Sequence, residues 1–385
     1  IQFRVDQRFA NSKAYSTDKV AQARDEGLVD VLVPEIYKGD WERFAGVVTH
    51  LYLDPTPSVT QIRAKMLADE AVKPGAFLKD ISYCWEGMGA DALPFIQPLM
   101  SNADPDVAFA AARAAAYIGD VTAQEALVNM ARTPHHKFRV DAVQVLGQLP
   151  ASPSINQSLR GLLDADENTI RIEAYRVLAK NADKSIFSKV VGDQKFVLDI
   201  VPCNAPPLIY ASRRGIPRIA VIGNKPQLKL PVTFLTMDDR FSISSNPGDK
   251  NVTMYYRPAQ VTANSPAQRA IQVISHPDAA EIIARLGGEG PEDTRGFDFD
   301  YADIVAIMQA MADGRKLSAP YGEQMASCTF MLQDLSGIEN TIYSAPVIPD
   351  QTRPQSENPT QVGVAIPDNT KDPTAIPEMP APVRK

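Results

Sequence analysis

The alternation of apolar and polar residues is most regular between Ser58 and Ile186, where one helical pattern recurs. Aligned copies of the pattern are offset by 30, 28 and 32 residues. A period of roughly 30 residues, with two short helices in each unit, is typical of a stacked α-solenoid. The four copies are Asp80–Gly89, Ala110–Gly119, Phe138–Gly147 and Ile170–Ala179.

Each unit also contains a second helix, and acidic or polar turns separate the units. In the turns Asn102–Asp106 and Asp164–Asn168, Asp and Asn side chains are suited to cap the next helix. Ala114, Ala142 and Ala174 recur where one helix must lie close to its partner. The block resembles HEAT-type repeats, which serve as binding or spacer surfaces. The second helices are predicted at Ala92–Met100, Ala123–Met130 and Ile155–Leu163.

The segment before the repeats, residues 1–57, is predicted to be a small α/β piece. Asp6–Phe9 ends a helix or turn, Asp18–Glu26 is polar and favours a helix, and Leu28–Pro34 is a β-branched strand stopped by proline. Trp41–Leu51 is predicted to be an amphipathic helix. Its apolar face is expected to carry Trp41, Phe44, Val48 and Leu51.

Residues 187–345 are predicted to form a β-rich region with two closing helices. A hairpin joins Arg240–Ser244 to Val252–Tyr256 across Asn246–Lys250, where Pro, Gly and Asp supply the turn. The other predicted strands are Phe196–Val201, Leu208–Ala211, Arg218–Ile222 and Leu228–Leu235.

The closing helices are predicted at Ala279–Leu286 and Tyr301–Gly314. Gly287–Gly290 reads as the C-cap of the first of them rather than as a phosphate-binding loop. The second has an apolar stripe in which methionine is core filler rather than part of a cofactor site. The stripe consists of Ile304, Ile307, Met308 and Met311.

Residues 346–385 contain nine prolines and no aromatic residue, so this tail is predicted to be extended or disordered. The predicted fold is therefore α+β and multidomain. A HEAT-like solenoid lies between an N-terminal α/β piece and a β-rich region with closing helices. The predicted domains are 1–57, 58–186, 187–345 and 346–385.

Length and charge limit the possible classes of protein. The chain of 385 residues is long enough for two or three domains, and its net charge of −7 argues against nucleic-acid binding as the main role. No apolar run approaches the roughly 18 residues needed to span a bilayer. The chain starts at Ile1 without an initiator methionine or a signal peptide, so we expect a processed or truncated product.

The three cysteines lie far apart in the sequence and do not have the spacing of a metal site. Cys84 is predicted to lie in the core of a helix. An odd number of cysteines allows at most one internal disulfide, and whether Cys203 and Cys328 form it stays open.

The histidines and one glycine-containing turn are the candidates for catalytic or ligand-binding groups. His50, at a helix end, reads as structural or solvated. His135 and His136 are adjacent, so their side chains point in different directions and do not share a face for a common metal. The fourth histidine, His276, has no catalytic partner in the sequence. Gly223–Lys225 follows a strand but lacks the spaced glycines of a phosphate loop. We therefore assign no catalytic, cofactor-binding or metal-binding residue.

Two charged clusters lie outside the repeats. The basic cluster reads as a solvated turn, with contact to an acidic partner surface as the alternative. The acidic cluster reads as favourable charge at a helix N-terminus, with cation binding as the alternative. The clusters are Arg213, Arg214 and Arg218, and Asp298, Asp300 and Asp303.

Two separate segments together resemble the flagellar basal-body P-ring protein family. At the back, Ile282–Leu286, Asp303–Met311 and Gly314–Leu317 are similar to the family's closing order: an apolar helix with a glycine turn, a helix of the form Asp-x-x-x-Ile-x-Gln-x-Met, a glycine and a short strand. At the front, Arg8–Asn11, followed by Val29–Pro34, is similar to its helix, strand and "Val-x-Val-Pro". Arg43–Phe44 and Leu51 then match its next helix, and the strands in 208–223 resemble a family β-pair with a basic-glycine turn.

The chain also departs from that family pattern. The family has no helical repeats, so Ser58–Ile186 would be an insertion, and its long N-terminal β-rich part and signal peptide are not in this chain. Glu289–Phe299 is longer than expected, and the sequence after Leu317 is extra.

The resemblance implies a secreted, non-enzymatic bacterial protein that oligomerises into a ring around the flagellar rod in the periplasm. Its partners would be other copies of itself and rod or other basal-body proteins, and the repeats would add a contact surface. The alternative is a HEAT-repeat protein-binding scaffold unrelated to the flagellum. An enzyme is the third hypothesis, and no constellation of residues in the sequence supports it.

Overall fold

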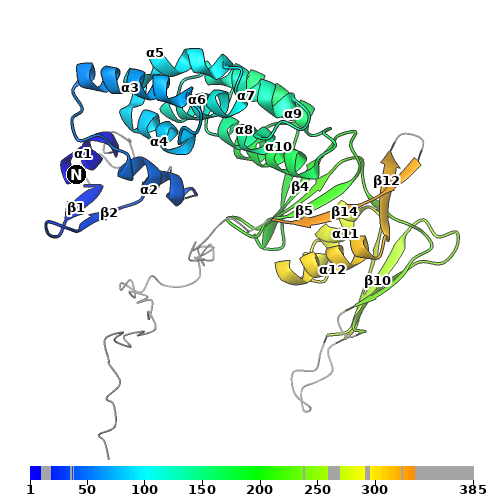
Figure 1. The fold of residues 1–385 in the computed structure, drawn as a ribbon. Coiled ribbons are helices and arrows are strands. Elements are labelled where there is room, and N and C mark those ends of the chain that lie inside the picture. The colour runs from blue at the N-terminus through cyan, green and yellow to red at the C-terminus, as the bar shows by residue number, and fades with distance from the viewer. Residues whose placement is uncertain are drawn as a thin grey trace, which may run out of the picture. The chain divides into compact units, whose positions relative to one another are not determined.

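The computed structural model of the chain contains both helices and β-sheets, which places the chain in the mixed α+β class (Figure 1). The chain divides into two compact units, Ile1–Asn340 and Thr341–Lys385, and every described residue lies in the first. The predicted tail, residues 346–385, lies outside the described residues. The structure describes residues 1–9, 19–34, 37, 39–236, 239–258, 269–290, 295–321 and 324–333.

The N-terminal segment contains helices and a two-stranded antiparallel sheet. The helix predicted over Asp18–Glu26 is wrong, because Ala21–Ala23 forms strand β1. The N–H of Ala21 donates to Asp6 Oδ1 (2.8 Å), and that of Ala23 donates to Gln2 Oε1 (2.9 Å). Pairing with β2 and with α1 therefore overrides the local preference. The elements are α1 (Gln2–Phe9), β1, β2 (Val29–Val31) and α2 (Trp41–Thr49).

The apolar face of α2 differs in one position from the predicted stripe. Phe44 and Val47 are buried in a small core with Phe9, Tyr37 and other residues. Trp41, the first residue of the helix, keeps 42% of its surface exposed, so the predicted apolar face is not buried at this position.

The repeat region is helical, and the four predicted repeat helices are confirmed as α4, α6, α8 and α10. Neighbouring members of this series contact one another in order. Ala114, Ala142 and Ala174 are fully buried, which confirms that the helices approach closely at small residues. The helices are α3 (Pro57–Ala71), α4 (Leu78–Met88), α6 (Pro105–Ile118), α7 (Ala123–Arg132), α8 (Arg139–Leu146), α9 (Pro153–Leu162) and α10 (Asn168–Lys180).

The predicted second helix of the first unit, Ala92–Met100, is broken into short pieces. Pro94 and Pro98 lack the N–H that an uninterrupted helix needs, so 3₁₀ turns flank a single α-turn. The pieces are η2 (Gly89–Ala92), α5 (Leu93–Ile96) and η3 (Gln97–Ser101).

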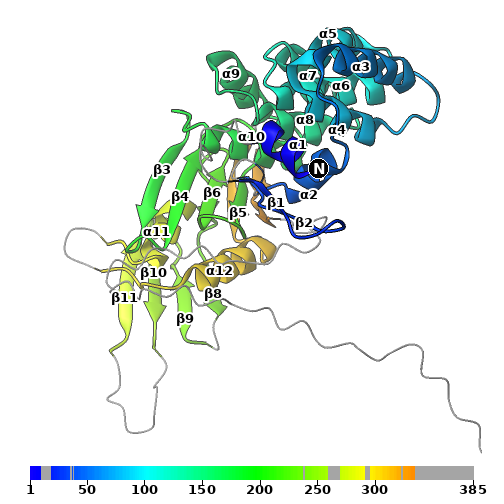
Figure 2. The same cartoon turned by 90° about the vertical axis from the view of Figure 1, so that its left-hand side faces the viewer.

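A five-stranded mixed sheet follows the helices, in the order β14-β5-β6-β4-β3 (Figure 2). Its strands alternate between two cores. Leu208 and Tyr210 belong to the core of the helices α3–α10, whereas Ile209 belongs to a second core with α11 and α12. The strands are β3 (Phe187–Val191), β4 (Phe196–Val201), β5 (Leu208–Ala211), β6 (Arg218–Ile222) and β14 (Thr329–Leu332).

A four-stranded antiparallel sheet and a three-stranded sheet complete the region. The predicted hairpin is confirmed, with Tyr256 opposite Phe241. The single strand predicted at Leu228–Leu235 is wrong, because Pro231, which cannot donate to a ladder, separates two strands of different sheets. These strands are β7 (Gln227–Leu228), β8 (Thr233–Thr236), β9 (Phe241–Ser244), β10 (Val252–Tyr256), β11 (Ile271–Ser275), β12 (Leu317–Tyr321) and β13 (Gln324–Ser327).

Both closing helices are confirmed, as α11 (Ala279–Leu286) and α12 (Tyr301–Asp313). Gly287 is the C-cap of α11, as predicted, and the apolar stripe of α12 is buried. In all, the described residues form three hydrophobic cores, and the domain boundaries drawn from the sequence stay predictions.

The carboxylate of Asp183 joins α9 to the turn after α10. It accepts hydrogen bonds from Arg160 Nη2 (2.7 Å), Asn156 Nδ2 (2.8 Å) and Ser185 Oγ (2.7 Å). The bonds from Arg160 and Ser185 hold the pKa of Asp183 below its ordinary value of 3.8, although burial opposes them. Because the folded pKa is depressed, this carboxylate contributes stability at neutral pH that is lost as the pH falls through its folded pKa.

We expect Asp183→Asn to lower the free energy of unfolding by about 1–2 kcal/mol at pH 7. The difference from the wild type should shrink at about pH 3, because the carboxylate begins to bind a proton in the unfolded chain at a pH where the folded chain still keeps it ionised. Urea unfolding at both pH values measures it. Asp141→Asn is the control, because Asp141 is exposed on α8 and makes no side-chain hydrogen bond within the described part of the chain. An equal loss of unfolding free energy at both pH values would contradict a depressed pKa of Asp183 in the folded chain.

Candidate functional site

A surface groove of about 660 Å³ runs between η3, the turn that precedes α6, and α7. Its apolar part contains two methionines and small residues, and its rim is rich in amide and hydroxyl groups. The lining residues are Gln97, Met100, Ser101, Asn102, Ala103, Pro105, Ala108, Thr122, Glu125, Ala126, Asn129, Met130, Thr133 and His136.

Asp120 fixes one end of the groove by joining η3 to the start of α7. Its carboxylate accepts hydrogen bonds from Gln97 Nε2 (2.9 Å) and from the hydroxyl (2.6 Å) and N–H (3.0 Å) of Thr122. Burial alone would raise the pKa of Asp120, but these bonds lower it below its usual value. The preceding Gly119 ends α6 in the left-handed region (φ +96°), which turns the chain toward α7.

Short-range hydrogen bonds fix the other end. Asn102 Oδ1 accepts from the N–H of Asp104 (2.8 Å), whose side chain caps α6. The N–H of Phe138 donates to His136 Nδ1 (3.2 Å). The ring of Phe138 in turn stacks on Phe109 at 4.3 Å between centroids.

The rim offers hydrogen bonds that the chain does not use itself. Glu125 and Asn129 are exposed and four residues apart, so they share one face of α7. Within the described residues neither side chain has a hydrogen-bond partner. A side-chain amide both donates and accepts, and methionine adapts to irregular apolar groups. Glu125 and His136 are the titratable groups among the lining residues.

The other histidines have structural positions. His50 is the C-cap of α2, where Nδ1 lies 2.7 Å from the carbonyl oxygen of Gly46, as the structural interpretation predicts. The N–H of His276 donates to Glu281 Oε1 at 3.4 Å. His135 does not line the groove, although its neighbour does. Among the described residues, no group of three His, Cys, Asp or Glu side chains is arranged to hold a metal ion.

The predicted basic cluster is only partly present in the structure. Arg218 does not belong to a basic surface patch, because its guanidinium donates to the buried carboxylate of Asp199 (2.7 Å). The main-chain N–H groups of Arg213 and Arg214 donate to Gln333 Oε1. The predicted basic cluster is therefore wrong in one of its three members.

The acidic cluster contacts a lysine. Lys195 Nζ lies 2.8 Å from Asp298 Oδ1 and 3.8 Å from Asp300 Oδ1. Asp300 is the N-cap residue of α12 without a capping side-chain bond, and Asp303 lies in the first turn. The predicted position at a helix N-terminus is thus correct, and Lys195 supplies further positive charge.

All three cysteines are free. Cys84 is buried in α4, as predicted, and burial raises its pKa to about 11. Burial likewise raises the pKa of Cys328 to about 12, so both thiols stay protonated at neutral pH. Gly223 follows β6, where a side chain would meet the main chain of Pro207.

A buried ionic cluster around Glu86 was not predicted. Glu86 Oε1 accepts from Arg43 Nε (3.1 Å) and from the hydroxyl of Tyr37 (3.1 Å), and the carboxylate is fully buried. The Arg43 guanidinium lies 3.6 Å from the ring centroid of Tyr117, and Arg8 donates to the Glu86 carbonyl (2.9 Å). Burial raises the pKa of Glu86, which Arg43 opposes. The cluster joins the N-terminal segment to α4 and α6.

A second buried cluster, around Asp199, joins α10 to the five-stranded sheet. Asp199 Oδ2 accepts from the hydroxyl of Tyr175 (2.6 Å) and from Arg218 (2.7 Å), and Ser188 donates to the other oxygen. Burial, followed by the negative charge of Asp199, raises the pKa of Tyr175. The sequence signal for both clusters is a lone acid in an otherwise apolar stretch.

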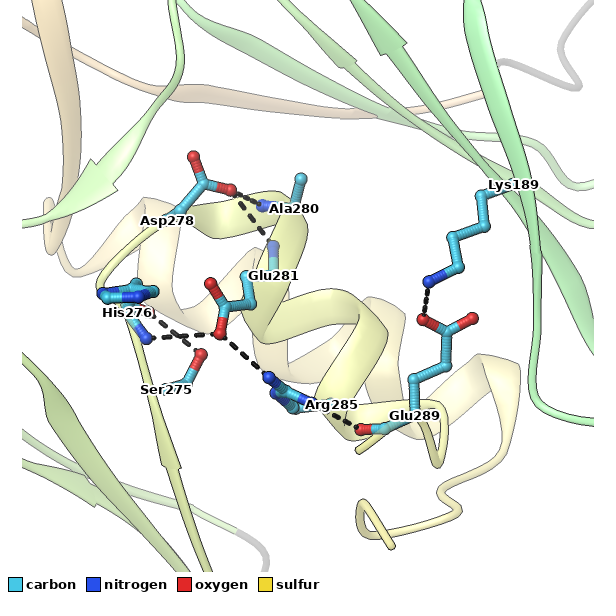
Figure 3. A network of polar contacts seen from close by, with 8 residues as sticks. All are labelled: Lys189, Ser275, His276, Asp278, Ala280, Glu281, Arg285 and Glu289. Carbon is cyan, nitrogen blue, oxygen red and sulfur yellow. Dashed lines mark hydrogen bonds and ion pairs between the residues drawn. The ribbon is translucent and has the colours of Figure 1, made fainter. Parts of the chain in front are cut away.

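A third network fixes α11 beside the edge strand β3 (Figure 3). Asp278 caps α11, and Glu281 pairs with Arg285 at 3.1 Å. Arg285 also reaches the carbonyl of Glu289, whose side chain pairs with Lys189 of β3. The network links α11 to β3 through charged side chains, and within the described residues the buried Arg285 Nε has no hydrogen-bond partner.

No known family model matches this chain, and no curated protein matches it either. Of the helices within the described ranges, none has the length and apolar character needed to cross a bilayer. The groove and the buried clusters therefore have to be interpreted from their own chemistry.

Proposed function

We propose that the chain is a non-enzymatic structural subunit of a flagellar P-ring-like assembly. In this proposal, copies of the chain form a ring around the rod in the periplasm. The helices α3–α10 act as HEAT-like repeats that add a contact surface.

The order of elements at the back of the chain carries this proposal. The resemblance expects an apolar helix, a glycine turn, a second helix, a glycine and a short strand. The described chain has α11, Gly287, α12, Gly314 and β12 in that order. At the front, α1, β2 and α2 follow the helix, strand and helix that the resemblance expects.

The oligomeric state of the purified full chain tests the proposal. We expect closed rings, seen by negative-stain electron microscopy, and a single large species in sedimentation velocity. A chain that stays monomeric or forms only dimers at high protein concentration, also in the presence of isolated rod proteins, would contradict it.

A second candidate function is a HEAT-like peptide-binding scaffold, and the groove favours it. The amide of Asn129 and the carboxylate of Glu125 are positioned to pair with the main chain of an extended segment. Met100 and Met130 offer apolar contact to its side chains. This function requires neither a ring nor a flagellum.

Peptides selected from a random library on the full chain test the groove. We expect Asn129→Ala to weaken the selected peptides about tenfold, which corresponds to one or two lost hydrogen bonds. Gln144→Ala is the control, because Gln144 is an exposed amide on α8 outside the groove. Isothermal titration calorimetry measures both. Equal affinities for the two variants would exclude the groove as the binding site.

A further inference from the structure

Strand β3 is an open edge of the five-stranded sheet. It pairs with β4 on one side, and no described strand lies on its other side (Figure 2). An unpaired edge presents free main-chain groups to which another strand can add.

The hydrogen-bond pattern identifies the free groups. The N–H of Val197 donates to the carbonyl of Pro217, so Val197 points toward β6 and not toward β3. Its antiparallel partner Val190 therefore points away from β4, as does Ser188 two residues earlier. Within the described residues, nothing bonds to the main-chain N–H or C=O of Ser188 and Val190.

The side chains of β3 do not protect this edge. Phe187 is 63% exposed and Val190 is 56% exposed. The strand contains no proline, and its one charge, Lys189, is drawn toward α11 by Glu289 (Figure 3). Exposed apolar residues beside free main-chain groups are the features that natural proteins usually avoid at an edge.

We propose that β3 binds β3 of a second copy of the chain in an antiparallel pair. In the proposed register, Ser188 faces Ser188 of the second copy, and a twofold axis passes between them. Each Phe187 then lies opposite Lys189 of the other copy, and each Val190 lies opposite Ile186. A twofold interface is self-complementary and closes at two copies.

Repulsion between lysine side chains favours this register over the register that is shifted by two residues. Shifting the pair so that Ser188 faces Val190 would bring the two Lys189 side chains directly opposite each other, and like charges in that position are destabilising. In the proposed register the ring of Phe187 instead meets the aliphatic stem of Lys189 of the second copy, whose ammonium group stays paired with Glu289. The two most exposed apolar side chains of the strand are both covered.

Proline substitution tests the edge without breaking β3 itself. The N–H of Val190 points outward, so Val190→Pro leaves the β3–β4 ladder intact while removing a donor to the second copy. We expect a concentration-dependent dimer of the wild type, and about a 100-fold larger dissociation constant for Val190→Pro. Val190→Thr, which keeps the N–H, should change the constant less than about threefold. Sedimentation equilibrium measures all three.

Cysteine cross-linking tests the register. In an antiparallel hydrogen-bonded pair the facing Cα atoms are about 5.5 Å apart, within disulfide range. Ser188→Cys should therefore form a covalent dimer under mild oxidation. Val190→Cys should not, because the two copies of that residue would be about 13 Å apart along the strands. The wild type, with its native cysteines, gives the background.

A monomeric wild type, or a dimer that Val190→Pro does not weaken, would overturn the proposal. Cross-linking through Val190→Cys but not Ser188→Cys would overturn the register. The inference does not rest on the proposed ring. If rings persist in Val190→Pro, the ring proposal stands and the β3 pairing proposal is not needed for it. If the wild type forms a β3-dependent dimer but no rings, the β3 pairing proposal stands and the ring proposal fails.

Discussion

Replacing Glu86 by alanine is expected to lower the free energy of unfolding by about 3–5 kcal/mol. The change removes the buried carboxylate that contacts Arg43 at 3.1 Å, and it leaves that guanidinium buried without its nearest counter-charge. Arg43 also pairs with Asp40, at 3.6 Å, but that side chain is partly exposed and is a weak substitute. Urea unfolding followed by circular dichroism measures the loss.

A matched control separates burial from charge. Glu42 lies on α2, one residue from Arg43, and pairs with Lys79 at the surface. Glu42→Ala should cost less than about 1 kcal/mol. The double variant Arg43→Met with Glu86→Leu should recover much of the loss, because it leaves no buried charge unpaired. Equal losses for Glu86→Ala and Glu42→Ala would show that the cluster contributes little.

Gly192→Ala is expected to lower the free energy of unfolding by about 2–4 kcal/mol. Gly192 has φ +55° in the turn between β3 and β4, where a side chain is strained. An added Cβ would also lie 2.1 Å from the carbonyl oxygen of Gly287, at the end of α11. Neither main-chain group can move without separating the hairpin from the helix.

Gly215→Ala separates the cost of a side chain at positive φ from the cost of the steric clash. Gly215 also has a positive φ (+68°), but a Cβ there would meet no atom within 4 Å. Its substitution should therefore cost only the conformational part, about 1–2 kcal/mol. Thermal and urea unfolding of both variants measure the difference. A loss no larger for Gly192→Ala than for Gly215→Ala would mean that the turn is free to move away from α11.

Local patterns predicted most of the helices in the repeat region and both closing helices, because the signals for these helices lie within a few residues of each other. The Ala-rich and Val-rich repeat helices, the caps such as Asp104, and the stripe on α12 are all of this kind. The hairpin of β9 and β10 was equally local, with Asn246–Lys250 as its turn.

Elements held by distant partners were missed. The strand β1 forms because Asp6 and Gln2 receive its N–H groups, and a helix-favouring composition gave no sign of this. The strand β3 was not predicted, although it pairs with β4 throughout. The pairing of Glu86 with Arg43 spans 43 residues, so the sequence offered only the oddity of an acid between Trp85 and Gly87.

The candidate groove could not be predicted from the sequence either. Its rim combines η3, whose helix was predicted to be unbroken, with α7 and with His136, which was considered only as one of an adjacent pair unsuited to a shared metal. Only the break caused by Pro98 and the capping by Asp120 bring these groups to one place.

Because Trp85 is buried beside Glu86, tryptophan fluorescence can follow the unfolding of the contact between the N-terminal segment and α4 separately from the rest of the chain. This contact is called the N-terminal junction. The protein has two tryptophans, Trp85 in α4 and Trp41 at the start of α2, and both belong to the elements that the Glu86 cluster joins. Intrinsic fluorescence excited at the red edge of the tryptophan band therefore reports on this junction and not on the sheets. If the fluorescence and far-ultraviolet transitions coincide, the junction melts together with the sheets; if the fluorescence changes first, the N-terminal segment detaches on its own.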